Sequence, residues 1–394
     1  MDSESLLNKS IESIDDLDAD SYLGYITLRP LPTNFISNIV MKPNKNFYDL
    51  KDSEKLFMIT VNQEVHIGNK KIEFPTFPFF HQDSMVTVCA HADMWMVANI
   101  MHKKYELDEI SIEKLVSGIS PSGSGRNIPS EGLTMEQLAY SIQANRWYAR
   151  IKYFSNKSDN HTIIQNVDKI MQYIDSSIES GIPCMLAFNN HVIVIAGHTV
   201  TGNKEREYII FDDSGHHIMS MFNEPEPKFS IKVSLKKLSE TLLDIKNDIF
   251  LLCPEFERVY FPLKSVHQMM RLLGIGISKN MKISKDIRNT LTDIIKNKNY
   301  RTLIIDCKKL KTFFSENNIN TFNECSLPHY IWFVEMYSGE RGNPDSVIGY
   351  MLFDASAHQS DFKYSFITDC NGKIIIKPVI CGKEKVMSLL EEFK

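Results

Sequence analysis

The stretch HQDSMVTVCAHADMWMVANIM, residues 81–101, decides how the chain is interpreted. From Cys89 to His102 the apolar residues recur with the period of a helix, and Gln82 precedes Cys89 by seven residues. A thiol reacts as its thiolate, and the unpaired N–H groups at a helix start favour an anion. Cys89 is therefore either a core thiol that begins a helix or a nucleophile placed at a helix start.

A nucleophilic cysteine also needs a base, and the sequence offers His191, the first residue of the strand-like run HVIVIAG. A histidine can form an ion pair with the thiolate and later protonate the leaving amine. The next strand-like run, EYIIFDD (207–213), ends in Asp212 and Asp213. If the two runs form an antiparallel hairpin, one carboxylate lies beside His191, because opposed side chains on one sheet face are about 5 Å apart.

Gln82 completes the expected site. Its side-chain amide can donate a hydrogen bond to the oxyanion of a tetrahedral intermediate, together with the backbone N–H of Cys89. The expected catalytic residues are listed in chain order: Gln82, Cys89, His191 and Asp212. Asp213 is the alternative to Asp212, because a one-residue error in the turn exchanges the two sheet faces.

These motifs, in this order, resemble the papain-like cysteine peptidases, and most closely their C39-like, bacteriocin-processing branch. The matching segments are HQDSMVTVCA, HVIVIAG and FDDSG, within residues 75–220. Two features depart from the family pattern: the Gln–Cys gap is slightly long, and Ala90-His91 replaces the usual Gly or Trp beside the cysteine. The resemblance implies an α+β domain with the cysteine on a helix and the His and Asp on an antiparallel sheet. It also favours Asp212 over Asp213, because Ser-Gly follows.

The resemblance implies a thiol protease or amide hydrolase that acts on peptide or isopeptide bonds of a peptide or protein substrate. A transporter-linked peptidase is not expected, because no ATP-binding or membrane segment accompanies the motifs. Two alternatives stay open. The same triad could pass the acyl group to an amine, as in a transglutaminase-like acyltransferase. A papain-like fold could also serve as a non-catalytic binding protein.

No metal or organic cofactor is expected at this site. His81, Cys89, His91 and Asp93 could be taken as a metal cluster. Helical spacing, however, places residues 89 and 93 on one face and residue 91 on the opposite face, which does not suit a shared metal. The GSG segment at 123–125 has neither a following Lys nor a preceding strand, so it indicates a loop and not a phosphate cradle.

Length and composition predict two domains. A chain of 394 residues exceeds one compact core, and 43% apolar with 24% charged residues is typical of globular proteins. Residues 1–20 carry seven acids against one Lys, which indicates a flexible acidic arm. We expect a papain-like hydrolase domain over residues 21–255. A smaller α/β accessory domain is expected over residues 256–394, where helical and strand patterns alternate.

Charge and cysteine usage suggest partners and compartment. Residues 264–311 contain twelve Lys or Arg against three Asp. An anionic partner at this basic stretch is therefore a hypothesis, whereas its few aromatic residues argue against nucleic acid. Seven scattered cysteines, and an N-terminus unlike a signal peptide, predict a cytoplasmic protein. The apolar runs fall well short of the roughly 20 residues that a membrane span needs, so no membrane association is expected.

Local signals predict several further elements. Thr134, followed three residues later by Gln137, is typical of a capping box that opens a helix. Gly68-Asn69 predicts a hairpin between strands at 56–61 and 70–74.

Overall fold

The computed structural model describes most of the chain. The described residues are 22–31, 34–43, 55–82, 89–117, 133–144, 148–155, 160–189, 191–200, 206–279, 285–317, 327–339, 341, 344–357, 363–368, 374–376 and 379–380. The expected acidic arm at residues 1–20 and the loop at 123–125 lie outside them.

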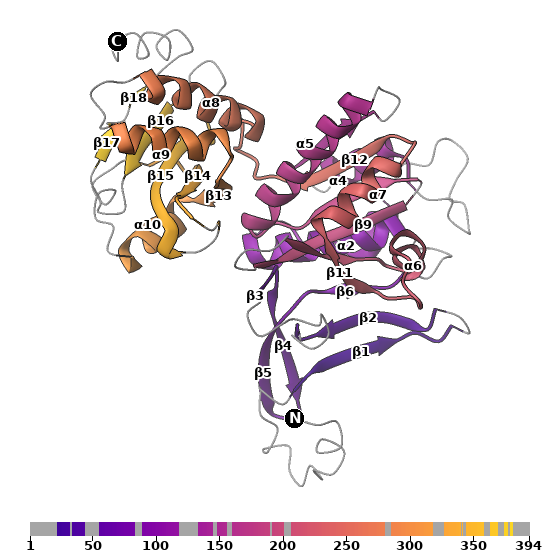
Figure 1. The fold of residues 1–394 in the computed structure, drawn as a ribbon. Coiled ribbons are helices and arrows are strands. Elements are labelled where there is room, and N and C mark those ends of the chain that lie inside the picture. The colour runs from indigo at the N-terminus through magenta and orange to yellow at the C-terminus, as the bar shows by residue number, and fades with distance from the viewer. Residues whose placement is uncertain are drawn as a thin grey trace. The chain divides into compact units, whose positions relative to one another are not determined.

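The chain is a mixed α+β protein whose sheets are built from antiparallel strand pairs (Figure 1). The helices are α2 (Cys89–Tyr105), α3 (Ile112–Ser117), α4 (Met135–Ala144), α5 (Asn160–Glu179), α6 (His216–Phe222), α7 (Leu235–Asp244), α8 (Leu263–Lys279), α9 (Lys285–Lys296) and α10 (Cys307–Glu316). The strands are β1 (Gly24–Leu28), β2 (Ile36–Met41), β3 (Lys55–Met58), β4 (Val61–Ile67), β5 (Lys70–Thr76), β6 (Phe79–Phe80), β7 (Ala149–Phe154), β8 (Cys184–Phe188), β9 (His191–Val200), β10 (Glu207–Phe211), β11 (Ser230–Ser234), β12 (Ile249–Pro254), β13 (Tyr300–Asp306), β14 (Tyr330–Tyr337), β15 (Val347–Asp354), β16 (Lys363–Thr368), β17 (Ile374–Ile376) and β18 (Val379–Ile380).

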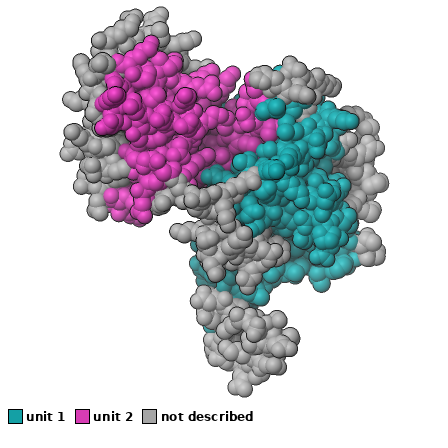
Figure 2. Space-filling view, viewed as in Figure 1, with its two compact units in different colours: residues 1–164, 182–199, 205–254 teal, residues 165–181, 200–204, 255–394 magenta. Residues whose placement is uncertain are grey.

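The chain divides into two compact units (Figure 2). The first unit contains residues 1–164, 182–199 and 205–254, and the second contains residues 165–181, 200–204 and 255–394. Most of α5 therefore groups with the C-terminal residues, although residues of the first unit flank it in the sequence. The domain limits expected from the sequence stay a prediction.

The main sheet of the first unit has the strand order β11-β10-β9-β8-β12-β7, and β3 also pairs with β9. The two strand-like runs of the expected site form an antiparallel pair, with Phe211 opposite Val194. Strand β9 is buried throughout its apolar run, as the unbroken sequence HVIVIAG predicts. Gly197 ends that run because β3 passes close by, and a Cβ at this position would lie 2.5 Å from the carbonyl oxygen of Phe57.

Two smaller sheets complete the first unit, β1-β2-β6 and β4-β5. The predicted Gly68-Asn69 hairpin joins β4 to β5, with Ile67 opposite Lys70. The strand predicted at 56–61 is instead split between β3 and β4, because the N–H of Ile59 donates to Ala196 of the main sheet.

Helix α2 begins at Cys89, where the periodicity predicts a helix start, and it is buried on most sides. Ala92, Met96 and Ile100 are fully buried along it. Helix α4 carries the predicted capping box at its start. The N–H of Thr134 donates to Gln137 Oε1 over 2.8 Å, and the N–H of Gln137 donates to Thr134 Oγ1 over 3.2 Å.

The second unit contains a sheet of order β13-β14-β15-β16-β17, with β18 paired to β16. Helix α10 packs on this sheet through a cluster formed by Leu310, Phe314, Ile331, Phe333 and Leu352. Neighbouring strands of this sheet pair antiparallel, including β13 and β14, which α10 separates in the sequence. The unit is therefore α+β, which corrects the expected α/β architecture of this region.

None of the helices, searched over the described residues, combines the length and apolar character that crossing a membrane requires.

Candidate active site

His191 is the first residue of β9, and it pairs with Phe188, the last residue of β8. Asn189 adopts a left-handed backbone with φ of +49°, a conformation that asparagine tolerates better than most residues. The imidazole is 4% exposed. The sequence thus places His191 on a rigid, buried strand end and not on a free loop.

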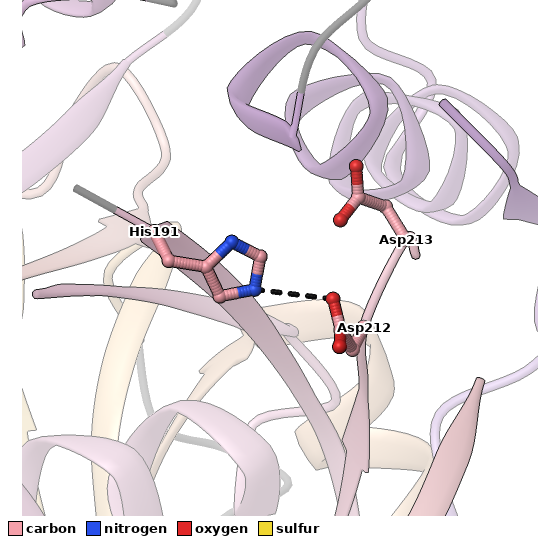
Figure 3. A group of neighbouring side chains, drawn as sticks. All are labelled: His191, Asp212 and Asp213. Atoms are coloured by element: carbon pink, nitrogen blue, oxygen red, sulfur yellow. Dashed lines mark hydrogen bonds and ion pairs between the residues drawn. The ribbon is translucent and has the colours of Figure 1, made fainter. Parts of the chain in front are cut away.

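Asp212 follows the last residue of β10 and holds the imidazole of His191. Its Oδ1 lies 3.1 Å from His191 Nε2, as Figure 3 shows. Oδ1 also accepts hydrogen bonds from the N–H and hydroxyl of Ser214, and Oδ2 accepts the N–H of Ile218, in α6, over 3.0 Å. Because Nε2 faces Asp212, Nδ1 is the ring nitrogen left to exchange a proton with a thiol.

The charge of Asp212 is stabilised despite its complete burial. Burial by itself raises the pKa of a carboxyl. This effect is outweighed by the hydrogen bond and charge of His191 and by the N–H groups of Ile218 and Ser214. Together these groups lower the pKa of Asp212 to about 2. Asp212 is therefore ionised at neutral pH and fixes the orientation of the His191 ring.

Asp213, the alternative partner, takes no part in the Asp212–His191 hydrogen bond (Figure 3). Its side chain is fully buried, and neither carboxyl oxygen has a hydrogen-bond partner among the described residues. Burial, followed by the negative charge of Asp212, raises the pKa of Asp213 to about 9. Asp213 therefore keeps its proton at neutral pH.

Asp93, on α2, is a second buried carboxyl of the same kind. It is fully buried, and its two oxygens also lack a hydrogen-bond partner among the described residues. Burial, and then the charges of Asp213 and Asp212, raise its pKa well above the usual range. Sequence reasoning noted that Asp93 shares a helix face with Cys89, but it did not assign Asp93 to the site.

Cys89 is the first residue of α2 and is partly buried. Burial, and then the charges of Asp93 and Asp213, raise the pKa of its thiol to about 12. The backbone N–H groups of Ala90 and Val192 act in the opposite direction. Val192 directly follows His191, so the thiol lies near enough to the start of β9 for its backbone to act on the pKa.

His217, in α6, covers one face of the His191 ring. The two rings are stacked with centroids 3.4 Å apart and an angle of 15° between their planes. Burial of part of the ring, and then the charge of His191, lower the pKa of His217. The sequence gives no signal for this stacking, because α6 was not expected.

Gln82 lies just after β6, and its neighbour His81 packs edge-on against Phe229. The carbonyl of Phe229 accepts the N–H of Asp212, so this segment lies beside the acid. Residues 83–88, which connect Gln82 to Cys89, lie outside the described part of the chain. The amide of Gln82 makes no hydrogen bond with another described residue, and its role as an oxyanion donor stays a prediction.

His191, Asp212 and Asp213 are the described residues whose grouping resembles a metal site, since one ligand atom of each lies within 4.8 Å of the others. The oxygens of Asp212, however, already accept four hydrogen bonds, and one of these comes from His191 Nε2. A cation at this place would therefore compete with the hydrogen bond that orients the imidazole.

No family model and no curated protein matches the chain. Among solved structures, the chain is similar to the crystal structure of UfSP from C. elegans, with 11% sequence identity and a TM-score of 0.32. The match covers 52% of this chain and 35% of the UfSP chain, so it spans about a third of that protein's length. A likeness this distant assigns neither an activity nor a family branch, so the C39-like branch stays a prediction.

Proposed function

We propose that this chain is a papain-like cysteine peptidase or amide hydrolase. The observation that supports the proposal most is the hydrogen bond between His191 Nε2 and Asp212 Oδ1, because it leaves Nδ1 available. Cys89 adds the nucleophile, since it begins α2 and the backbone N–H of Val192, the residue after His191, favours its thiolate. A buried His–Asp pair with a helix-start thiol is the arrangement that acyl transfer through a cysteine requires.

In the proposed reaction, His191 Nδ1 accepts the thiol proton of Cys89, and the thiolate attacks the carbonyl carbon of an amide. The amide of Gln82 and the backbone N–H of Cys89 donate hydrogen bonds to the tetrahedral oxyanion. His191 then gives its proton to the leaving amine, which breaks the C–N bond and leaves an acyl-enzyme. Water, deprotonated by His191, attacks this thioester and releases the acid and the free thiol. The substrate class is a peptide or protein amide, including an isopeptide.

The buried carboxyls set the conditions under which this thiol can ionise. At neutral pH Asp213 holds its proton, because its pKa is raised to about 9. A neutral carboxyl does not repel the thiolate, so the repulsion from Asp213 acts on Cys89 only in alkaline solution. At neutral pH the main opposition to the thiolate is therefore burial, which substrate binding and proton transfer to His191 must overcome.

A second candidate function is a non-catalytic, papain-like binding protein. One observation favours it: burial and the two nearby acids raise the pKa of the Cys89 thiol to about 12. A thiol of this kind is weakly nucleophilic at neutral pH unless His191 removes its proton.

Thiol reactivity separates the two functions. We expect iodoacetamide at pH 7 to alkylate Cys89 faster than Cys253 and Cys307, which are free and also partly buried. Labelling of Cys89, followed by peptide mass spectrometry, should fall strongly in His191→Ala. His66→Ala is the matched control, because His66 lies exposed on β4. If Cys89 is no more reactive than the reference thiols and does not respond to His191→Ala, the catalytic proposal fails.

Activity is then measured with a peptide library read by mass spectrometry. Cleavage that is lost in Cys89→Ala supports a peptidase. Addition of a labelled primary amine distinguishes the acceptors, since incorporation of the amine in place of hydrolysis would indicate an acyltransferase.

A further inference from the structure

A group of basic side chains in the second unit is not used by the proposed reaction. It contains His267, Arg271, Lys298 and Arg341, and together with the adjacent Tyr300 these residues are called the basic cluster. His267 and Arg271 lie four residues apart on α8, and therefore on one face of that helix. Tyr300 is the first residue of β13, and its hydroxyl lies 3.1 Å from His267 Nδ1.

The two loops that carry the remaining cations are tied together. Lys298 has a left-handed backbone, with φ of +54°, in the turn after α9. The side-chain amide of the next residue, Asn299, donates to the carbonyls of Tyr337 and Gly339 over 2.7 and 2.8 Å. These carbonyls lie at the end of β14, in the segment that leads to Arg341. The fold thus brings together the two segments that carry Lys298 and Arg341.

The electrostatics of the cluster show that the three cations act on the same place. Burial, and then the charges of Lys298, Arg271 and Arg341, lower the pKa of His267 to about 4. Burial raises the pKa of Tyr300, and Arg271 and Arg341 oppose that shift. The cations are only partly neutralised, because Arg341 pairs with Asp175 over 3.4 Å. Arg271 and Lys298 form no ion pair with a described residue.

Two buried nitrogen atoms of the cluster have no hydrogen-bond partner among the described residues, His267 Nε2 and Arg341 Nε. The guanidinium Nε always carries a hydrogen and can only donate. If the Tyr300 hydroxyl donates to His267 Nδ1, Nε2 carries the ring hydrogen and is also a donor. Buried donors without an acceptor are rare in folded proteins and point to a missing partner.

We propose that the basic cluster binds the phosphoryl group of a small ligand, either inorganic phosphate or a phosphate monoester. The missing partner has to accept hydrogen bonds, and the surplus of positive charge favours an anion. A phosphate dianion offers several acceptor oxygens and balances two of the three cations, and guanidinium groups favour it through paired hydrogen bonds. The cluster lies largely within the basic stretch 264–311 and extends it by Arg341, which is distant in the sequence.

The proposal is tested with the full chain, carrying ¹³C-labelled histidine, in a titration with inorganic phosphate at constant ionic strength. Of the twelve histidines, the ring signal of His267 should shift and saturate. The pKa of His267 should rise, because a bound anion favours the protonated ring. The signal is assigned with His267→Gln. Parallel titrations with O-phosphoserine distinguish the two sources, since the tighter ligand identifies a free phosphate or a monoester.

The double variant Arg271→Gln/Arg341→Gln should weaken phosphate binding by at least about tenfold. Lys308→Gln/Lys311→Gln removes the same charge from the exposed face of α10 and should leave binding unchanged. Arg271→Gln alone is a second test that spares the Arg341–Asp175 pair. The proposal is overturned if the His267 signal does not respond saturably, if the arginine variants bind as well as the wild type, or if acetate binds equally well.

Discussion

The two units of the molecule contain buried polar centres of opposite kind. In the first unit, the buried carboxyl oxygens of Asp93 and Asp213 have no donor among the described residues. In the second unit, buried donors of His267 and Arg341 have no acceptor within the described part of the chain. A carboxyl without donors can be satisfied from within, because it takes up a proton and becomes neutral. A guanidinium cannot lose its proton in the physiological range, so its unpaired Nε donor requires an acceptor from outside.

This difference separates a centre that adjusts its own charge from one that requires a ligand. Asp212 lies between the two extremes, since it is as buried as Asp213 but accepts hydrogen bonds at both oxygens. The following predictions test the comparison.

The largest effect is expected from Asp212→Asn, which replaces the ionised carboxylate with a neutral amide. The amide presents either a donor or an acceptor to His191 Nε2 and no longer stabilises an imidazolium. We expect amide cleavage to fall by at least about 100-fold, in line with the role of the acid in such triads. The fall should appear in kcat at saturating peptide.

The control for this prediction is Asp244→Asn, because Asp244 is an exposed acid at the end of α7 in the same unit. Its activity should equal that of the wild type. Full activity in Asp212→Asn would show that the hydrogen bond to His191 is structural only.

The second prediction concerns the pH dependence of stability in the first unit. The folded pKa of Asp213 is raised to about 9, whereas the carboxyl ionises near 3.8 when it is not perturbed. The folded state therefore binds more protons between these values, and stability is lost as pH rises from about 4 to about 9. The slope approaches about 1 kcal/mol per pH unit. Hydrogen exchange of β9 in wild type and Asp213→Asn, compared at each pH, isolates this contribution; parallel curves would contradict it.

The third prediction concerns the thiol. Asp213→Asn removes a charge that opposes the Cys89 thiolate only when Asp213 is ionised. Alkylation of Cys89 should therefore be unchanged at pH 7 and about tenfold faster than in the wild type above pH 9, for a change of about one unit in the thiol pKa. A uniform increase at all pH values would mean that Asp213 is ionised at neutral pH.

The smallest effect is expected in the second unit, and it has the opposite sign. The folded pKa of His267 is lowered to about 4, so the unfolded chain binds more protons between about 6.5 and 4. Stability is therefore lost as pH falls through this range. Partial exposure screens the ring, so the total loss of stability is expected to be about 1 kcal/mol. Exchange protection of β14 should show this loss in the wild type and not in His267→Gln, and phosphate should diminish it.

The sequence predicts elements whose signals are local. Thr134 and Gln137 form the capping box, and Gly68-Asn69 forms the hairpin, because each signal lies within one turn of the chain. The start of α2 at Cys89 follows from the helical period. The pairing of β9 with β10 also follows from two adjacent apolar runs.

The features of the site that the sequence did not predict depend on contacts between residues far apart in the chain, which no local pattern contains. The stacking of His217 on His191 requires α6 to fold back over the strand ends, and α6 forms where Asp212 accepts the N–H of Ile218. The raised pKa of Asp93 depends in part on the charge of Asp213, which is 120 positions away in the sequence. Arg341 joins His267 only through the tertiary arrangement of β13 and β14. Sequence periodicity carries no information about such pairs.

Helix α5 has a practical consequence for dissecting the molecule. Its C-terminal part groups with the second unit, where Arg301 donates to Glu179 over 3.1 Å and the N–H of Ile304 donates to Ser180 over 2.8 Å. A fragment that stops at residue 254 keeps this segment but loses its partners. Splitting the gene after β12 should therefore yield an insoluble N-terminal fragment, and a C-terminal fragment that needs residues 165–181 supplied in trans.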